Sequence, residues 1–524
     1  MPRQTGVLPL SSLFIAPFDA PSVGKNIVMT SETPATTILL ATTLATSLVA
    51  GGTLYFVKQR LSRPYVHVVD DKNTSPPGPP RALLGGNVKN FPKDRWTETF
   101  TAWTKTYGDV IYIQLPKRPI LILNSLSDAD DMLNKRAGIY SGRPDNFMVN
   151  VLMDFSWSIS QAQPGPKHNE ARKVFRKSIG PRAVADFDTL LEADAEKLVA
   201  AFTGFSGDPR EIIVDTVSGS VLKLAYGEKV AKKHGSQLVQ LNEQAITIIT
   251  SSSTSVWLPT SFQSWLPGLS FHEFADKSKY ILSQLRSVAY DEVKLAADQG
   301  KGDLSIVSRY LNETEFTKED LRDAVAMLYI GGVDTTSIAL LNFVGQMVIH
   351  PDILRKIQTE LDDKIGRGRV PRASEMDSLT YLRAVWRIDT IPCTCVPIPH
   401  CSLQDDVWKG YFIPKGTVII PNIEFMLRDP RFWGKDADVF NPDRFLVQRE
   451  LGQPDVDSIP FGFGRRICPG RFLSARNGML YAAALLATYD VLPLEGDKAP
   501  TGLTHSEGKF KFPTNVKCRF VARQ

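Results

Sequence analysis

The sequence predicts a mainly α-helical domain with small β-sheets, preceded by one N-terminal transmembrane helix. Long segments with apolar residues three and four positions apart dominate the body of the chain, which indicates amphipathic helices. Short β-branched runs interrupt them, which indicates small sheets. An uncharged stretch, residues 36–57, lies ahead of the body. The 524 residues, 43% of them hydrophobic, can form a globular core, and we find no repeats, so we predict one main domain.

The first predicted element is the membrane anchor at residues 36–57, TTILLATTLATSLVAGGTLYFV. These 22 residues carry no charge and match the about 20 residues that cross a bilayer core as a helix. Lys58, Arg60 and Arg63 follow directly, so the positive-inside rule places the body, residues 81–524, in the cytosol. A cleaved signal peptide is the alternative, but its basic residues should precede the apolar stretch.

Two segments flank the predicted anchor. Residues 1–35 show no helical or strand periodicity, and Met29, just before the anchor, is an alternative start of the protein. Residues 58–80 form a basic and proline-rich hinge that ends in the sequence SPPGPP. Because proline fixes φ and removes a backbone donor, we expect this segment to be a stiff spacer between membrane and body.

The body begins with a predicted hairpin and continues as helices. Residues 108–124, GDVIYIQLPKRPILILN, contain two β-branched runs around Pro116 and Lys117, which predicts a β-hairpin. Strand character returns at residues 411–421. Apolar spacing of three and four predicts helices at residues 183–203, 274–297, 318–350, 351–365 and 471–488.

Charge and cysteine content exclude some classes of function. The formal net charge of +5, from 61 basic and 56 acidic residues, is small for this length and no basic block stands out, so we expect no nucleic-acid partner. The five cysteines are an odd number, a poor framework for disulfides, and indicate a reducing compartment. Zinc binding by Cys393, Cys395 and Cys401 is an alternative, but no fourth ligand other than His400 has a recognisable spacing, so we expect free thiols.

A glycine- and arginine-rich loop, PFGFGRRICPG at residues 460–470, surrounds one of these cysteines. Gly464 and its neighbours let the backbone turn sharply and approach a bound group. Pro469 precedes an apolar periodic run, so Cys468 is predicted at a helix N-terminus, where the dipole favours a thiolate. A thiolate is a strong ligand for iron, and Arg466 is placed to pair with an anion near that metal. A buried, unreactive cysteine is the alternative.

This loop resembles the haem-binding loop of the cytochrome P450 family, F-x-x-G-x-R-x-C-x-G. The five fixed positions are occupied by Phe461, Gly464, Arg466, Cys468 and Gly470. The resemblance implies the cytochrome P450 fold, with Cys468 as the axial thiolate ligand to the iron of haem b and the loop residues Phe461, Gly464 and Arg466 in contact with that cofactor.

A second resemblance lies in the middle of the predicted helix 318–350. The segment GGVDTT, residues 331–336, places two adjacent glycines where each costs about 1 kcal/mol relative to alanine, which a purely structural helix would avoid. It is similar to the family's central A/G-G-x-D/E-T-T segment. Above a haem, the glycines would leave room for O₂, Thr335 would offer a hydroxyl and Asp334 would relay protons.

Further resemblances extend over residues 76–520. The segments NIEFMLRDPRFW and FNPDRF are similar to the family's meander, and His400 is similar to a residue that often touches a haem propionate. In HNEAR, His168 takes the place of a tryptophan and Arg172 is retained. The resemblance implies that Arg466, Arg172 and His400 contact the propionates.

One departure from the family is serious. The E-x-x-R helix is approached by TYLRAVWR, but Ile388 and Ile391 stand where Glu and Arg belong, and Pro392 would break the helix. Arg444 of the meander would lack its carboxylate, and breaking such a buried charge cluster costs about 3 to 5 kcal/mol. Three explanations compete: a rescue by Asp389, a degenerate inactive relative, or an incorrect exon boundary or short frameshift.

The resemblance implies an expected function. The chain is similar to microsomal fungal monooxygenases of natural-product biosynthesis, which insert one oxygen atom of O₂ into an apolar small molecule such as a terpenoid. Electrons would come from NADPH through a separate NADPH-cytochrome P450 reductase, since no flavin- or nicotinamide-binding segment is evident. The implied location is the endoplasmic reticulum membrane, single-pass, with the catalytic domain cytosolic and in contact with lipid. The alternatives are a non-catalytic haem-fold protein and a haem-thiolate isomerase or dehydratase that needs no reductase.

Overall fold

The computed structural model describes residues 75–83, 85–116, 118–254, 270–389, 397–446, 459–506 and 510–524. All of them belong to the second of two compact units, Val69–Gln524. The predicted anchor, residues 1–35 with Met29, and most of the hinge lie outside the described residues. So do Ile391, Pro392, Cys393 and Cys395, and the side chains of Ile388 and Asp389.

The strands form two small sheets and a two-stranded ribbon. The four-stranded sheet has the order β1-β2-β7-β4, with β1 antiparallel to β2 in a hairpin that confirms the prediction. The second sheet has the order β3-β9-β8, and β5 pairs with β6. The strands are β1 Val110–Leu115, β2 Arg118–Leu123, β3 Ser206–Gly207, β4 His400–Cys401, β5 Asp406–Trp408, β6 Tyr411–Ile413, β7 Val418–Pro421, β8 Tyr489–Pro493 and β9 Cys518–Ala522.

Helices make up most of the rest. The long ones are α2 Trp96–Tyr107, α5 Pro166–Ile179, α6 Asp188–Ala201, α7 Arg210–Tyr226, α8 Glu228–Thr254, α10 Ser270–Asp298, α12 Lys318–Ile349, α13 Pro351–Lys364, α14 Thr380–Asp389 and α17 Arg471–Thr488. The short α-helices are α3 Leu126–Ala129, α4 Ala137–Tyr140, α11 Ile306–Tyr310, α15 Ile423–Met426 and α16 Pro430–Trp433. Two π-helical turns are η2 Asp130–Lys135 and η3 Met148–Leu152, and 3₁₀ turns are η4 Ala183–Phe187, η6 Ala373–Ser378, η7 Pro442–Phe445, η8 Ile459–Phe461 and η9 Gly464–Arg466.

The helix α12 is the centre of the core. The Thr317 hydroxyl accepts the Asp320 N–H at 3.0 Å, which caps the N-terminus of the helix. Within the described residues, α12 is the one helix long and apolar enough to cross a membrane, but 78% of its most apolar window is buried inside the protein. A helix that is apolar all round and covered by other helices is a core helix.

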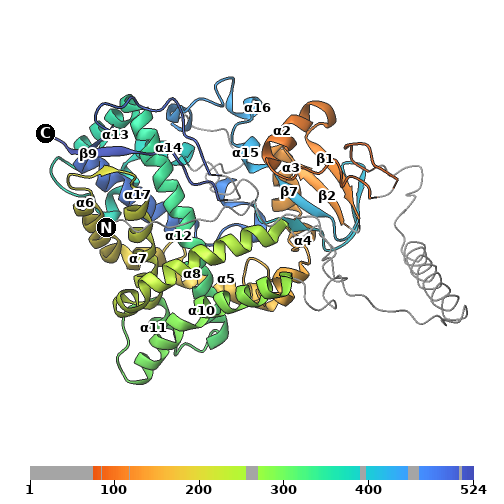
Figure 1. Cartoon of the computed structure of the whole chain (residues 1–524), viewed down its shortest axis with the longest axis horizontal. Helices are drawn as coiled ribbons and strands as arrows, with labels where there is room; N and C mark the ends of the chain where they lie inside the picture. The colour runs from red at the N-terminus through yellow and green to blue at the C-terminus, as the bar shows by residue number, and fades with distance from the viewer. Residues whose placement is uncertain are drawn as a thin grey trace, which may run out of the picture. The chain divides into compact units, whose positions relative to one another are not determined.

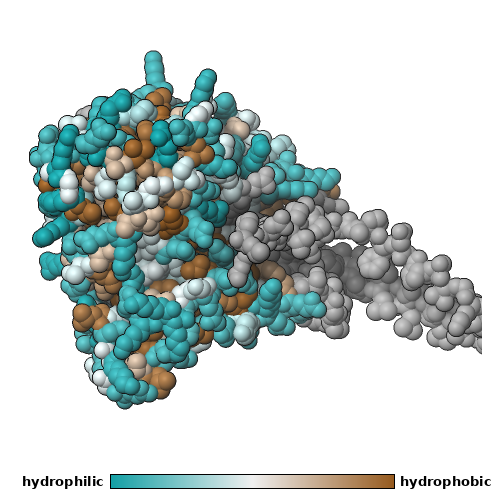
Figure 2. Space-filling view, turned by 60° about the vertical axis from the view of Figure 1, so that its left-hand side comes forward, coloured by the Kyte–Doolittle hydropathy of each residue, from teal (hydrophilic) through white to brown (hydrophobic). Residues whose placement is uncertain are grey.

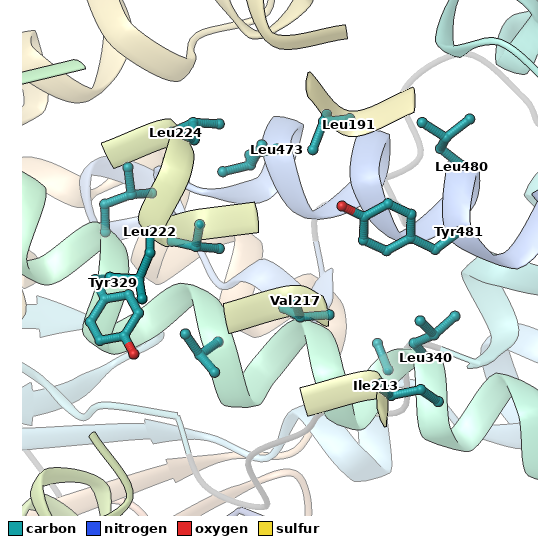
Figure 3. Close-up of a cluster of buried hydrophobic side chains, with 14 of the residues drawn as sticks. Leu191, Ile213, Val217, Leu222, Leu224, Tyr329, Leu340, Leu473, Leu480 and Tyr481 are labelled. Carbon is teal, nitrogen blue, oxygen red and sulfur yellow. The ribbon is translucent and has the colours of Figure 1, made fainter. Parts of the chain in front are cut away.

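The helices α5, α7, α10 and α17 pack directly on α12 (Figure 1). Figure 3 shows side chains of α7, α12 and α17 meeting in one apolar cluster, with Tyr329 and Leu340 from α12 facing Leu222 and Ile213 from α7. The outer face in Figure 2 is mainly hydrophilic with scattered apolar residues, which is normal for a folded surface.

A buried polar chain orients α17, the helix that follows the cysteine loop. The Tyr481 hydroxyl of α17 lies 2.7 Å from the Ser220 hydroxyl of α7, which donates to Asp194 of α6 at 2.7 Å. Lys223 of α7 forms an ion pair with the same carboxylate. Because buried polar groups are costly unless paired, this chain favours a single arrangement of the three helices.

Candidate cofactor site

The cysteine loop is a closed turn in front of α17. The Cys468 N–H donates to the Phe461 carbonyl at 2.8 Å, which brings the two ends of the loop together. The helix begins at Arg471 with Gly470 at its N-cap, two residues later than the sequence predicted from Pro469. Cys468 therefore lies just outside the first turn, where backbone donors can still reach its sulfur.

The Cys468 side chain lies among backbone donors and a positive charge. It is partly exposed although protein surrounds it. Burial raises the pKa of the thiol, while the N–H groups of Gly470 and Arg471 and the charge of Arg172 lower it, and burial prevails. The backbone N–H groups and Arg172 favour the thiolate, as predicted, but burial favours the neutral thiol more strongly. The anionic form therefore needs a bound cation such as a metal ion.

Gly464 has a conformation and a contact that exclude larger residues. Its φ is +55°, and its N–H donates to the Asn134 side-chain oxygen at 2.5 Å. A Cβ at this position would lie 2.1 Å from the Leu133 carbonyl oxygen and 3.2 Å from the Ala137 Cβ. The loop can approach η2 this closely only with glycine here.

Three arginines converge behind this loop, and we call Arg143, Arg172 and Arg466 the guanidinium cluster. Arg466 donates to the carbonyls of Ser141 and Ala162, both at 2.7 Å. Arg172 donates to the carbonyl of Ile467, next to the cysteine, at 2.5 Å.

Arg143 is a member of the guanidinium cluster that the sequence did not reveal. It is 7% exposed and donates to the carbonyls of Ile398 and Pro399 at 2.8 Å, immediately before His400. Burial and the neighbouring Arg466 hold its pKa below the ordinary value.

Two neutral histidines accompany the cluster. His400 is buried with its Nδ1 2.9 Å from the Tyr140 carbonyl, and burial and Arg143 lower its pKa to about 3. Burial and Arg466 lower the pKa of His168 to about 4. A neutral imidazole can still donate one hydrogen bond to an anion.

These five side chains fit a dianionic group. In the part of the chain that the structure describes, none of them pairs with a carboxylate, and the arginines bind only backbone carbonyls. Uncompensated buried charge costs several kcal/mol, so the arrangement calls for an anion that the chain itself does not supply. Among the described residues no group of three or more His, Cys, Asp or Glu could hold a metal ion, so an iron here would depend on Cys468 and on its own macrocycle. Haem b, with two propionates, meets both conditions.

Gly331, in the middle of α12, borders free space. A Cβ on Gly331 would meet nothing within 4 Å, whereas a Cβ on Gly332 would lie 3.6 Å from Val221 of α7. Gly331 is exposed although α12 is otherwise mostly buried. The Thr335 hydroxyl donates to the Gly331 carbonyl at 2.7 Å. The predicted room therefore exists at Gly331, with Thr335 beside it, while Gly332 serves close helix packing.

Asp334 is a buried carboxyl directed toward other helices. It is 6% exposed, and burial and the charge of Glu243 on α8 raise its pKa to about 6, against the opposing charge of Arg210 on α7. A group with this pKa can take up and release a proton near neutral pH.

The raised pKa predicts a pH-dependent effect of Asp334→Asn. Asp334 adds stability below its unfolded pKa of 3.8, and this is lost as pH rises through about 6, because the native state must then bury a charge. Asparagine avoids that cost. The variant should match wild type near pH 3.5 and be more stable at pH 8 by up to about 3 kcal/mol. Denaturant unfolding at both pH values measures this; an equal difference at the two would contradict it.

The structure joins some of the predicted site residues and leaves others separate. Phe461, Gly464, Arg466 and Cys468 form one loop, and Arg172 binds its backbone. Two adjacent backbone carbonyls link His400 to this loop. The Tyr140 carbonyl accepts from His400, and the Ser141 carbonyl accepts from Arg466. Thr335 and Asp334 lie on α12, which packs against α17 behind the loop, and no hydrogen bond links them to it among the described residues.

Within the described residues, the meander itself binds Arg444, and no α14 carboxylate does. Its guanidinium is 10% exposed and donates to the carbonyls of Asp436 and Val439 at 2.6 and 2.7 Å and to that of Asn441 at 3.1 Å. The Asp436 carboxylate lies 3.6 Å away. The meander therefore folds around Arg444 and stabilises its charge from within.

Comparison with known proteins identifies the family of the chain. The family model for cytochrome P450 matches residues 76–515. Cytochrome P450 monooxygenase 136 of Postia placenta is 31% identical, covering 84% of this chain and 87% of that protein. Tryptamine 4-monooxygenase of Psilocybe cyanescens is 29% identical, covering 92% of this chain and 97% of that protein. The chain is a member of the cytochrome P450 family.

Proposed function

We propose that this protein is a haem-thiolate monooxygenase that inserts one oxygen atom of O₂ into an apolar small molecule. The observation that carries the proposal is the buried guanidinium cluster, which has no carboxylate partner in the described chain and lies against the loop of the partly exposed Cys468. Haem b held there would supply the iron-centred chemistry that activates O₂.

The chain's own residues have distinct roles in this proposal. Cys468 supplies the thiolate, and Arg143, Arg172, Arg466 and His400 orient the propionates by charge and hydrogen bonding. The free space at Gly331 leaves room for a small reactant.

Proton delivery in this proposal rests on α12. The Thr335 hydroxyl lies beside the free space, and Asp334 holds or releases a proton at neutral pH because burial raises its pKa to about 6. Glu243 on α8 is exposed and lies within electrostatic reach of Asp334.

An acidic redox partner fits the surface beside the cysteine loop. The helix α5, which carries Arg172, holds five basic residues and one acidic residue in PKHNEARKVFRKSI. Arg176 on this helix and Arg465 in the loop are exposed. We propose that a separate NADPH-cytochrome P450 reductase binds here and delivers the two electrons of each cycle.

The sequence supports a proposal for the cellular location of the protein. We propose that residues 36–57 anchor the chain in the endoplasmic reticulum membrane, with residues 58–80 as hinge and the catalytic domain cytosolic, where it meets membrane-dissolved apolar substrates. Several relatives are named as fungal cytochrome P450 monooxygenases, and we propose that this protein acts in secondary-metabolite biosynthesis.

The test is turnover by the purified protein with and without reductase. Incubation with reductase, NADPH, ¹⁸O₂ and a panel of terpenoid and aromatic substrates should give products that carry one ¹⁸O atom, and omission of reductase should abolish them. Turnover without reductase would instead identify an isomerase or dehydratase. Haem binding without NADPH consumption for any substrate would identify a non-catalytic haem protein.

A further inference from the structure

A salt bridge joins α10 to α12 at a buried carboxylate. Arg286 of α10 donates to both oxygens of Asp323 on α12, at 2.5 and 3.0 Å, and also to Glu319 at 2.9 Å. Asp323 is 4% exposed, and Lys167 of α5 lies 3.9 Å from it. Bidentate pairing fixes the guanidinium plane of Arg286.

This fixed guanidinium plane covers an aromatic ring. Arg286 lies 5.2 Å from the ring centre of Trp157, which is buried and meets Phe155 edge to face at 5.1 Å. A cation held above a tryptophan face is attracted to the ring, so the fixed guanidinium favours one orientation of Trp157.

Trp157 begins a tight turn that ends at Gln163. The Ser158 carbonyl accepts the N–H groups of Gln161 and Ala162 at 3.0 and 2.8 Å, and the Ser158 hydroxyl accepts the Ser160 N–H at 3.1 Å. A turn bonded this closely moves as a unit, so its position depends on the Trp157 ring at its start.

The carbonyls of this turn orient two members of the guanidinium cluster. Ala162 accepts from Arg466 at 2.7 Å, and Ser160 accepts from Arg143 at 2.9 Å. Gln163 bonds the backbone of Arg143 twice, donating to its carbonyl at 2.8 Å and accepting its N–H at 3.1 Å. The turn from Trp157 to Gln163 thus joins Arg286 on α10 to the arginines behind the cysteine loop.

We propose that Arg286 is a positioning residue for the cofactor: through Trp157 it holds the turn whose carbonyls aim Arg143 and Arg466. The inference rests on the proposed haem site. The helix α10 packs against α8 and α12 (Figure 1). If Arg286 has this role, the position of α10 affects how tightly the cofactor is retained.

Another arginine provides a matched control. Arg309 also stacks on an aromatic ring, at 5.2 Å from Phe187, and pairs with Asp186 at 3.0 Å. Asp186 and Phe187 are the side chains that Arg309 contacts in the described part of the chain, and neither belongs to the turn or to the guanidinium cluster. Removing Arg309 therefore costs a similar contact without disturbing the proposed coupling.

The test measures haem loss, independently of turnover. Holoproteins are mixed with excess apomyoglobin, and haem transfer is followed by absorbance under conditions where circular dichroism shows each variant fully folded. R286A and W157L should lose haem roughly 10-fold faster than wild type, the size of effect seen when groups that orient a ligand shell are removed. W157F keeps an aromatic ring beneath the Arg286 guanidinium and should stay close to wild type, as should R309A.

The outcomes separate this inference from the proposed function. Wild-type protein that binds no haem would overturn both. Wild type that keeps haem while R286A and W157L lose it no faster would overturn this inference alone, as would an equal acceleration in R309A. If R286A does not fold, W157L decides the question, because it leaves the Arg286–Asp323 pair in place.

Discussion

Cys468→Ser is expected to abolish the absorption band near about 450 nm that the reduced carbon monoxide complex of a haem thiolate gives. A serine hydroxyl keeps its proton at neutral pH, so the iron would lose its anionic ligand. The guanidinium cluster remains, so the variant should still fold. The measurement is the reduced carbon monoxide difference spectrum of purified variant and wild type.

A second cysteine serves as the control for this prediction. Cys518 in β9 is also buried, and burial raises its pKa to about 12, so it stays a neutral thiol. Cys518→Ala should lower stability slightly and leave the band unchanged. Persistence of the band in Cys468→Ser, or its loss in Cys518→Ala at equal folded content, would assign the ligand elsewhere.

Gly464→Ala is expected to destabilise the protein and to prevent haem uptake. The left-handed backbone costs about 1 kcal/mol or more for alanine, and its Cβ would lie 2.1 Å from the Leu133 carbonyl oxygen, so the loop or η2 must move. Overpacking of this kind costs about 1 to 3 kcal/mol, for a total of roughly 2 to 4 kcal/mol. Denaturant unfolding and haem content measure the two effects.

The neighbouring glycine separates backbone strain from crowding. Gly462 has a φ of +84°, but a Cβ there would meet nothing within 4 Å. Gly462→Ala should therefore cost only the strain, about 1 to 2 kcal/mol, and leave haem uptake near wild type. Equal effects of the two substitutions would show that contact with η2 is not what requires glycine at position 464.

The sequence predicted the elements whose pattern is local and strong. Helix α17 has the bounds that its apolar spacing predicted, although Pro469 indicated a start two residues earlier. Helix α12 ends one residue early, and the β1–β2 hairpin is present. The helix α7 went unpredicted because residues 210–226 are apolar on several sides and show no clean stripe. The helix α8 was missed although Val230, Leu238, Ala245 and Ile248 form a buried apolar stripe at helical spacing. Residues 183–203 split into a 3₁₀ turn and α6.

The candidate site was predictable where a motif is continuous in sequence and not where the fold assembles it. The cysteine loop and GGVDTT were both evident, and membership of the family confirms the resemblance that they carried. Arg143 has no motif of its own; only the fold brings it beside Arg466 and His400. Likewise, the separate roles of Gly331 and Gly332 depend on which neighbour faces each one.

Sequencing the transcript can decide whether the segment that replaces E-x-x-R belongs to the protein. The structure describes the backbone of α14 to Asp389 and resumes at residue 397, so the segment between them lies outside the described residues. Arg444 has backbone carbonyl acceptors and a carboxylate 3.6 Å away within the meander, which offset part of the cost of the missing helix carboxylate. Sequencing the transcript across codons 380–400 distinguishes an incorrect exon boundary or frameshift from a real loss; a confirmed IDTIPCTCV excludes the first.

The most direct test of the central claim is the absorption spectrum of wild-type protein purified from haem-replete cells, reduced and exposed to carbon monoxide. The account predicts a band near about 450 nm with one haem per chain. A folded, soluble chain that comes out colourless would contradict it, because buried arginines without an anion and a cysteine without a metal would then need another explanation.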